Sequence, residues 1–197
     1  MRIHIVSGSQ LEGSQSARVA GVLKSRLLAL EVCGQGDCQI QDLGTDPLPL
    51  WDKTAGSELM PQADFIRRAD GLILISPDWH GMATPALKNW FYFLPDQAIE
   101  HKPVLLCGVS AGQGGLYPVM DLRAHSFKNF RPCYLPEHLL IRQVKSHFLH
   151  ADPTTDEQAM LLARTDYCLL LLQAYAAGFQ QIRRVLPERH PAFSYGM

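Results

Sequence analysis

A short stretch near the N-terminus combines the residue types that can bind a phosphate without a charged side chain. Residues 8–16 read GSQLEGSQS and follow the apolar run at residues 3–6. Gly8 and Gly13 let a ligand approach the backbone, and the first turn of a helix presents unpaired N–H groups and the positive end of the helix dipole. Two interpretations remain open: a serine-capped helix after a glycine turn, or a phosphate site formed by Ser9, Gly13, Ser14, Gln15 and Ser16.

A second loop, residues 76–89 with the sequence SPDWHGMATPALKN, joins a very apolar run to a helix start. Thr84 and Pro85 are typical of the N-cap and first position of a helix. The compact bend before them suits the edge of a flat aromatic ring, although a surface turn with one packed tryptophan is the alternative. The candidate residues of this bend are Pro77, Asp78, Trp79, His80 and Gly81.

A third loop, residues 108–117 with the sequence GVSAGQGGLY, is rich in glycine. We expect its backbone N–H groups to be uncovered and suited to carbonyl oxygens or ring nitrogens of a ligand. A single glycine-rich turn is weak evidence. The candidate residues are Ser110, Gly112, Gln113, Gly114 and Gly115.

The elements that position these loops alternate between strands and helices. Apolar runs predict strands at residues 2–8, 38–43, 70–77, 102–110 and 138–144, and helical patterns fill the intervals, the last over about 155–183. Near-continuous apolar strands indicate a parallel sheet covered on both faces. The sequence predicts one α/β domain over residues 1–197, a flavodoxin-like three-layer sandwich with a five-stranded parallel sheet. Ligands of such sheets bind at the carboxyl ends of strands, where all three loops fall.

The last helix has two notable features. Thr154 and Glu157 fit a capping box at its start. Its body is apolar almost all round, which predicts cover by more than one surface, and the tail over residues 186–197 is expected to dock on this chain or on a neighbouring subunit.

Composition excludes several classes of function. The formal net charge is -1, with 47% hydrophobic and 19% charged residues, so nothing favours nucleic acid as a partner. The five cysteines include no C-x-x-C pair, and Cys107 and Cys168 lie in apolar runs, which indicates free thiols in a reducing compartment. The histidines show no metal-ligand spacing. No leader-like or bilayer-spanning stretch is seen, and we expect a cytoplasmic protein with no metal and no membrane contact.

At these three loops the chain resembles the NADPH-dependent FMN reductases of the flavodoxin-like superfamily, which include quinone, chromate and azo-dye reductases. The resemblance runs from residue 1 to about residue 144. It covers the first loop, the SPDWHGMATPALKN loop with its Leu-Lys-Asn, and the KPVLLCGVSAGQGG strand and turn. It is specific for family and cofactor, and it leaves the acceptor and the choice between NADPH and NADH open.

The resemblance assigns roles to the candidate residues. Ser9, Ser14, Gln15 and Ser16 would hold the FMN phosphate, the bend at residues 77–81 would line the ring and ribityl chain, and the loop from Ser110 would face the pyrimidine side of the ring. It implies a ping-pong cycle in which a nicotinamide passes hydride to FMN and a small acceptor then takes the electrons. It identifies no catalytic side chain.

Departures from the family pattern are also informative. Leu11 stands where relatives often carry arginine, and Glu12 beside it predicts modest flavin affinity unless its carboxylate faces solvent. The aromatic run at residues 90–93 cannot face the sheet as a whole, because helical residues are about 100° apart. In the family such a helix lies at a dimer interface, so we expect a homodimer or a tetramer, with burial under the chain's own tail as the alternative.

Two other functions fit parts of this pattern. A flavodoxin-type electron carrier would bind FMN without oxidising NAD(P)H, but such carriers are strongly acidic. A non-catalytic nucleotide-binding module would not bind FMN at all.

Overall fold

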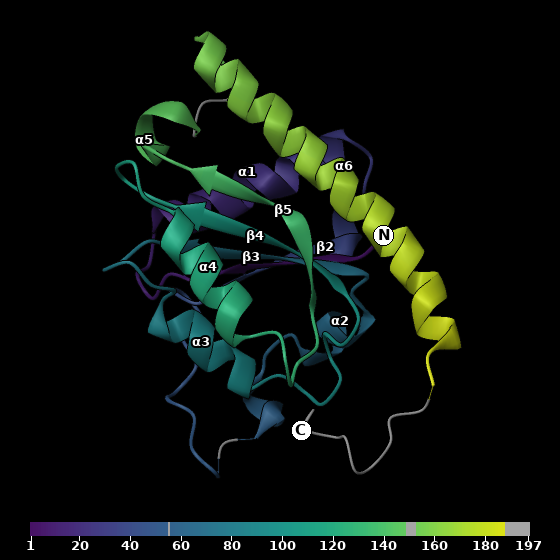
Figure 1. Cartoon of the computed structure of the whole chain (residues 1–197). Coiled ribbons are helices and arrows are strands. Elements are labelled where there is room, and N and C mark those ends of the chain that lie inside the picture. The colour runs from purple at the N-terminus through teal and green to yellow at the C-terminus, as the bar shows by residue number, and fades with distance from the viewer. Residues whose placement is uncertain (55, 149–152, 188–197) are drawn as a thin grey trace.

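The computed structural model describes residues 1–54, 56–148 and 153–187 and contains one parallel sheet in the order β2-β1-β3-β4-β5 (Figure 1). The strands are β1 (Ile3–Ser7), β2 (Cys38–Asp42), β3 (Gly71–Pro77), β4 (Pro103–Val109) and β5 (Cys133–Ile141). The α-helices are α1 (Gln15–Ala29), α2 (Ala63–Arg68), α3 (Pro85–Tyr92), α4 (Leu116–His125), α5 (Val144–His147) and α6 (Asp156–Val185). Short 3-10 helices lie at Gln35–Asp37 and Ser57–Leu59. The predicted flavodoxin-like sandwich with five parallel strands is confirmed.

Helices cover both faces of the sheet and bury two separate core layers. One layer joins the sheet to α1 and α6 through residues such as Leu23 and Leu172, and the other joins it to α2, α3 and α4 through residues such as Ile66. Alternate residues of a strand point to opposite faces, so Ile73 belongs to the first layer and Leu74 to the second. This double burial explains why the central strands read as continuous apolar runs.

Both predicted ends of the fifth strand and the predicted N-cap of the last helix are wrong; the strand ends at Ile141, not at residue 144. The fifth strand begins at Cys133 rather than at residue 138, because β5 is an edge strand that pairs with β4 alone. An edge strand tolerates a proline such as Pro136, and that proline interrupts the apolar run by which strands are found in the sequence. The N-cap of α6 is Thr155, whose hydroxyl accepts the Gln158 N–H at 3.2 Å, so the capping site lies one residue later than predicted.

The aromatic run at residues 90–93 is covered mostly by this chain itself. Trp90, Phe91 and Phe93 are buried, and the Trp90 Nε1 donates to Gln41 Oε1 at 2.8 Å. Phe93 reaches the core because it follows Trp90 by three residues and therefore lies on the same side of the helix, and its backbone at the C-cap is still αR. Tyr92 is the exposed member of the run. The predicted tail spans residues 186–197, and from residue 188 onward it lies outside the described residues.

His4 gives the core a dependence on pH. Its ring is fully buried, Nδ1 has no hydrogen-bond partner among the residues that the structure describes, and Nε2 lies 3.4 Å from Gln41 Oε1. Burial lowers the His4 pKa from 6.5 to about 4, and the charge of Lys102 adds to that lowering against the opposing bond to Gln41.

We expect His4 to stabilise the fold fully above pH 6.5 and to lose that contribution between pH 6.5 and pH 4. In this range His4 takes up a proton in the unfolded chain but not in the folded chain. The free energy of unfolding therefore falls by at most about 3 kcal/mol between pH 6.5 and pH 4. Urea unfolding at several pH values measures it. His4→Leu should flatten the pH dependence, and an unchanged slope in that variant would contradict the assignment.

Candidate functional site

The first loop is attached to the neighbouring strand and helix. The Gly8 N–H donates to Ile75 O at 2.8 Å, and the Thr84 hydroxyl donates to Gly8 O. A Cβ on Gly8 would lie 2.6 Å from Ile75 O, so only glycine permits this approach. The glycine that the sequence suggested for contact with a ligand therefore serves close packing between β1 and β3.

The start of α1 provides the polar groups of this loop. Ser14 is the N-cap and accepts the Ala17 N–H at 3.1 Å, while Gly13 takes a left-handed φ of 64° just before it. The backbone N–H groups of Gln15 and Ser16 have no partner within the helix, as the geometry of a helix start requires. These amides and the Ser14 hydroxyl face the same helix end, which is suited to an anion.

The side chains of this loop differ in accessibility. Ser9 and Ser16 are buried, and the Ser9 hydroxyl accepts the Leu11 N–H at 3.2 Å, so it shapes the loop. The Gln15 Oε1 is buried without a hydrogen-bond partner within the described residues, which leaves one acceptor for a ligand donor. Glu12 is exposed, which is the condition under which we expected its carboxylate not to weaken flavin binding.

The second loop is a tight turn at the end of β3. Trp79 and Met82 form an antiparallel β-bridge. Between them, His80 and Gly81 have φ values of 55° and 71°. Two consecutive left-handed residues define a type I′ turn. Asp78 Oδ1 accepts the Gly81 N–H at 3.2 Å and holds the turn at its base. The turn places Trp79 half-buried and His80 at the exposed tip.

Asp78 joins the second loop to the third. Its Oδ2 accepts the Gly115 N–H at 2.7 Å, and a Cβ on Gly114 would lie 2.7 Å from the same oxygen. Gly108 and Gly115 pack equally closely, because a Cβ on Gly108 would lie 1.9 Å from Gly115 O. The glycines of the third loop thus allow the carboxylate and the end of β4 to meet.

The structure brings the three loops together at the carboxyl ends of β1, β3 and β4, through Thr84 between the first two and Asp78 between the last two. The expectation of uncovered amides is wrong for Gly112 and Gly115. The Gly112 N–H donates to the Ser110 hydroxyl at 3.1 Å, and Gly115 donates to Asp78. Gln113 is exposed at the loop tip. A role for any of these residues in binding a cofactor stays a prediction.

Two contributors to the site were missed by the sequence analysis. The Leu43 N–H donates to Ser7 O at 3.0 Å, and Gly44 packs on the Leu11 carbonyl, so the loop after β2 forms a further wall. Tyr117 lies beside Gly81 and is 66% exposed. Gly44, just after the second strand, was a signal in the sequence for the loop after β2. The position of Tyr117 has no such signal, because it depends on how α4 packs.

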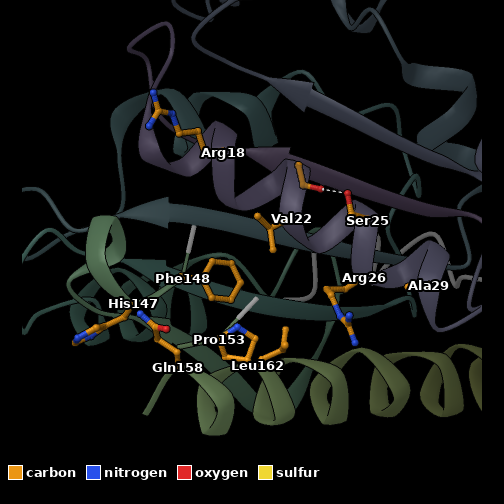
Figure 2. A pocket seen from close by; sticks show the side chains of 11 residues that line it. Arg18, Val22, Ser25, Arg26, Ala29, His147, Phe148, Pro153, Gln158 and Leu162 are labelled. Carbon is orange, nitrogen blue, oxygen red and sulfur yellow. Dashed lines mark hydrogen bonds between the residues drawn. The ribbon is translucent and has the colours of Figure 1, made fainter. Parts of the chain in front are cut away.

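A separate pocket of about 680 Å³ lies between α1 and the segment that carries α5 and the start of α6. Figure 2 shows Val22, Phe148 and Leu162 facing one another across it. Two of its polar groups are already engaged: Arg26 binds Asp166 at 2.6 Å and the Ser25 hydroxyl donates to Gly21 O at 3.1 Å. None of the residues predicted from the sequence lines this pocket, and we assign no ligand to it.

Two further searches concern the described part of the chain. Within residues 1–54, 56–148 and 153–187, no three histidine, cysteine or acidic side chains gather as metal ligands. In the same residues no helix combines the length and the apolar character needed to cross a bilayer.

Known structures share the fold. The flavoenzyme NAD(P)H:(acceptor) oxidoreductase FerB from Paracoccus denitrificans superimposes with a TM-score of 0.66 at 15% identity, over 90% of this chain and 98% of that one. An apo NADH:FMN oxidoreductase, EmoB, gives a TM-score of 0.57 at 20% identity, over 98% of this chain and 94% of its own. At these identities the likeness is one of fold alone.

Sequence relatives and a family model give the family. An NADPH azoreductase from Bacillus sp. (strain OY1-2) is 28% identical over 109 residues, 51% of this chain and 60% of the azoreductase. A quinone reductase from Escherichia coli (strain K12) is 34% identical over 74 residues, 33% of this chain and 39% of the reductase. The matches therefore span less than two thirds of either relative. The model of NADPH-dependent FMN reductases matches residues 1–145, and the chain belongs to this family.

Proposed function

We propose that this protein is an FMN-dependent NAD(P)H oxidoreductase. The observation that carries the proposal is the joining of the three loops by Asp78 and Thr84 at the strand ends where ligands of such sheets bind. The family match and the names of the relatives, an azoreductase and a quinone reductase, support it.

The residues present fit FMN at its phosphate end. The amides of Gln15 and Ser16, with the Ser14 hydroxyl, offer neutral donors at a helix start where the dipole favours an anion. The partnerless Gln15 Oε1 is an acceptor suited to a ribityl hydroxyl. With no cationic side chain in the GSQLEGSQS loop, affinity depends on these amides keeping their positions.

At the ring end, the chain supplies position and shielding. The turn from Trp79 to Met82 and the loop from Ser110 to Gly115 would hold the edge of the ring. The amides of Gly81, Gly112 and Gly115 are bonded within the chain, so donors to the ring oxygens, where negative charge develops on reduction, would come from the other amides of these loops. When bound, FMN supplies the two-electron chemistry between a reduced nicotinamide and an acceptor. We assign no side chain as an acid or base in that transfer.

We propose a ping-pong order, with the nicotinamide leaving before the acceptor occupies the same surface. The exposed side chains Met82, Leu116 and Tyr117 make the approach to this surface apolar. That favours flat apolar acceptors such as quinones or azo compounds over metal oxyanions. NADPH and NADH are both donors to test.

Three further features belong to this proposal. We infer that residues 1–197 form one FMN-binding domain, that it acts in the cytoplasm, where its five cysteines stay free thiols, and that it assembles as a homodimer or tetramer.

The test is an absorbance spectrum of the purified protein with and without FMN, followed by NADPH or NADH under anaerobic conditions and then a quinone. We expect bound flavin to be bleached by one or both nucleotides and restored by the quinone, with steady nucleotide oxidation. Flavin that binds but is not reduced by either nucleotide would indicate an electron carrier. Protein that binds no FMN would indicate a non-catalytic module, and either result overturns the proposal.

A further inference from the structure

The segment that connects β5 to α5 is fastened to the third loop. The Ser110 N–H donates to Ile141 O at 2.9 Å, and the Val144 N–H donates to Ser110 O at 3.2 Å. Between these two contacts, the Gln143 N–H donates to Gly112 O at 2.9 Å. Three backbone hydrogen bonds therefore hold this segment against the glycine-rich loop at the carboxyl end of β4.

Gln143 makes the connection through an uncommon backbone conformation. Its φ of 44° and ψ of 45° are left-handed, a region that residues other than glycine seldom adopt. The chain thereby turns directly from β5 into α5, which Figure 1 shows at the end of the sheet where the arrows of β4 and β5 point. Strained backbone of this kind is concentrated at functional sites. We therefore looked for a side chain that this turn presents to the third loop.

Arg142 brings a positive charge to that loop. Its Nε donates to Gly114 O at 3.3 Å, and its side chain is exposed. Within residues 1–54, 56–148 and 153–187, the other two guanidinium nitrogens have no hydrogen-bond or ion-pair partner. These nitrogens carry four N–H donors in a planar group. The contact with Gly114 fixes the guanidinium beside the loop and leaves those donors for a ligand.

The acidic group at the same loop is already occupied. Asp78 follows β3 and Arg142 follows β5, which are the two neighbours of β4 in the sheet. The Asp78 oxygens accept the amides of Gly81 and Gly115, at 3.2 Å and 2.7 Å. The third loop is thus bonded to a carboxylate from one neighbouring strand and to a guanidinium from the other. No ion pair joins these two groups in the described part of the chain.

The charge of Arg142 matches a need that the amides of the third loop leave unmet. This loop is expected to face the pyrimidine side of the FMN ring, where negative charge develops on reduction. The Gly112 and Gly115 amides are bonded within the chain, and the remaining amides of the loop are neutral. A charged donor stabilises an anion more strongly than a neutral donor does.

We propose that Arg142 supplies the positive charge that stabilises anionic reduced FMN in this protein. This role rests on the proposed function and adds to it a residue that selects between the two redox states of the cofactor. The oxidised ring is neutral, so Arg142 should matter little for its affinity. The phosphate carries the same charge in both states, so an effect of Arg142 on the phosphate cancels when the two affinities are compared.

The test is the midpoint potential of bound FMN, measured by anaerobic titration with dithionite and indicator dyes, together with the dissociation constant of oxidised FMN. In Arg142→Gln we expect the affinity for reduced FMN to fall about tenfold, and that for oxidised FMN to change less than about threefold. A tenfold change for a two-electron couple lowers the potential by about 30 mV. Arg142→Lys keeps the charge and should recover most of that loss.

Lys145→Gln is the matched control. Lys145 is an exposed cation three residues later, and it has no hydrogen bond to the third loop in the described chain. Its removal should shift the potential much less than Arg142→Gln does, and the melting temperatures of all three flavin-free variants should equal that of the wild type. An equal shift in Lys145→Gln would show that only net charge matters. A loss in Arg142→Gln that Arg142→Lys does not restore would assign the effect to the shape of the loop. Either result overturns the proposal.

The outcomes also separate this role from the proposed function. Dithionite replaces the nicotinamide in the titration, so the measurement requires bound FMN but no reaction with NADPH or NADH. An unchanged potential in Arg142→Gln overturns the role of Arg142 alone. Flavin that binds but is not reduced by either nucleotide overturns the proposed function alone, and protein that binds no FMN overturns both.

Discussion

Ser14→Asp is expected to weaken FMN binding about 1000-fold while leaving the fold intact. Two unit charges about 4 Å apart near a protein surface interact by about 4 kcal/mol, and here the interaction is repulsive. A tenfold change in affinity corresponds to about 1.4 kcal/mol. Titration of the protein with FMN, followed by flavin fluorescence, measures the dissociation constant.

The substitution is selective because aspartate is as good an N-cap as serine. It can accept the Ala17 N–H in the same way, and its charge interacts favourably with the helix dipole. The melting temperature of the flavin-free protein should therefore not fall. A loss of FMN binding then reports on the phosphate alone.

Two controls separate charge from shape. Ser14→Asn keeps a neutral cap of nearly the same size as aspartate and should bind FMN within about tenfold of the wild type, since only a hydroxyl donor is exchanged. Riboflavin lacks the phosphate, so its affinity should be the same in the aspartate and asparagine variants. An unchanged FMN affinity in Ser14→Asp would show that the phosphate does not bind at the start of α1.

Gly108→Ala is expected to destabilise the flavin-free protein by about 4 kcal/mol, at the extreme end of single substitutions. The new Cβ would lie 1.9 Å from Gly115 O, a contact that forces the third loop away from β4. That movement also breaks the bond from the Gly115 N–H to Asp78, so FMN binding should fall with stability. Urea unfolding followed by circular dichroism measures the change.

Gly112→Ala is the matched control four residues later. A Cβ at Gly112 has nothing within 4 Å, so the variant should unfold within about 1 kcal/mol of the wild type. Equal stability of the two alanine variants would mean that β4 and the third loop are not held as described. If Gly108→Ala yields no folded protein while Gly112→Ala does, the expected ranking holds.

Much of the fold was predictable from sequence, because a strand that is buried on both faces appears in the sequence as a run of apolar residues. Strands such as β3, covered by helices on both sides, are apolar at nearly every position, and they alternate with helices in the chain. The edge strand β5 escaped this rule, because its outer edge has no neighbour and its pattern is interrupted at Pro136. The N-cap of α6 was misplaced because Thr154 and Thr155 fit the capping signal equally well.

The candidate site was located but not understood from sequence. The sequence placed glycines and small polar residues after three strands, and the general rule for parallel sheets brought those strand ends together. It assigned Asp78 to the ring of a ligand, whereas the carboxylate accepts amides of Gly81 and Gly115 and holds two loops in place. It also treated Gly8 as a point of ligand approach, whereas Gly8 packs on Ile75.

The sequence by itself therefore determined the sandwich, the order of its elements and the three loops that meet at one edge of the sheet. These depend on periodicity and on local turn chemistry, both of which are written along the chain. The tertiary structure alone decided which amides are already bonded and which aromatic residues of the run at 90–93 are covered. Each of these depends on contacts between residues far apart in sequence, and no local pattern specifies such contacts.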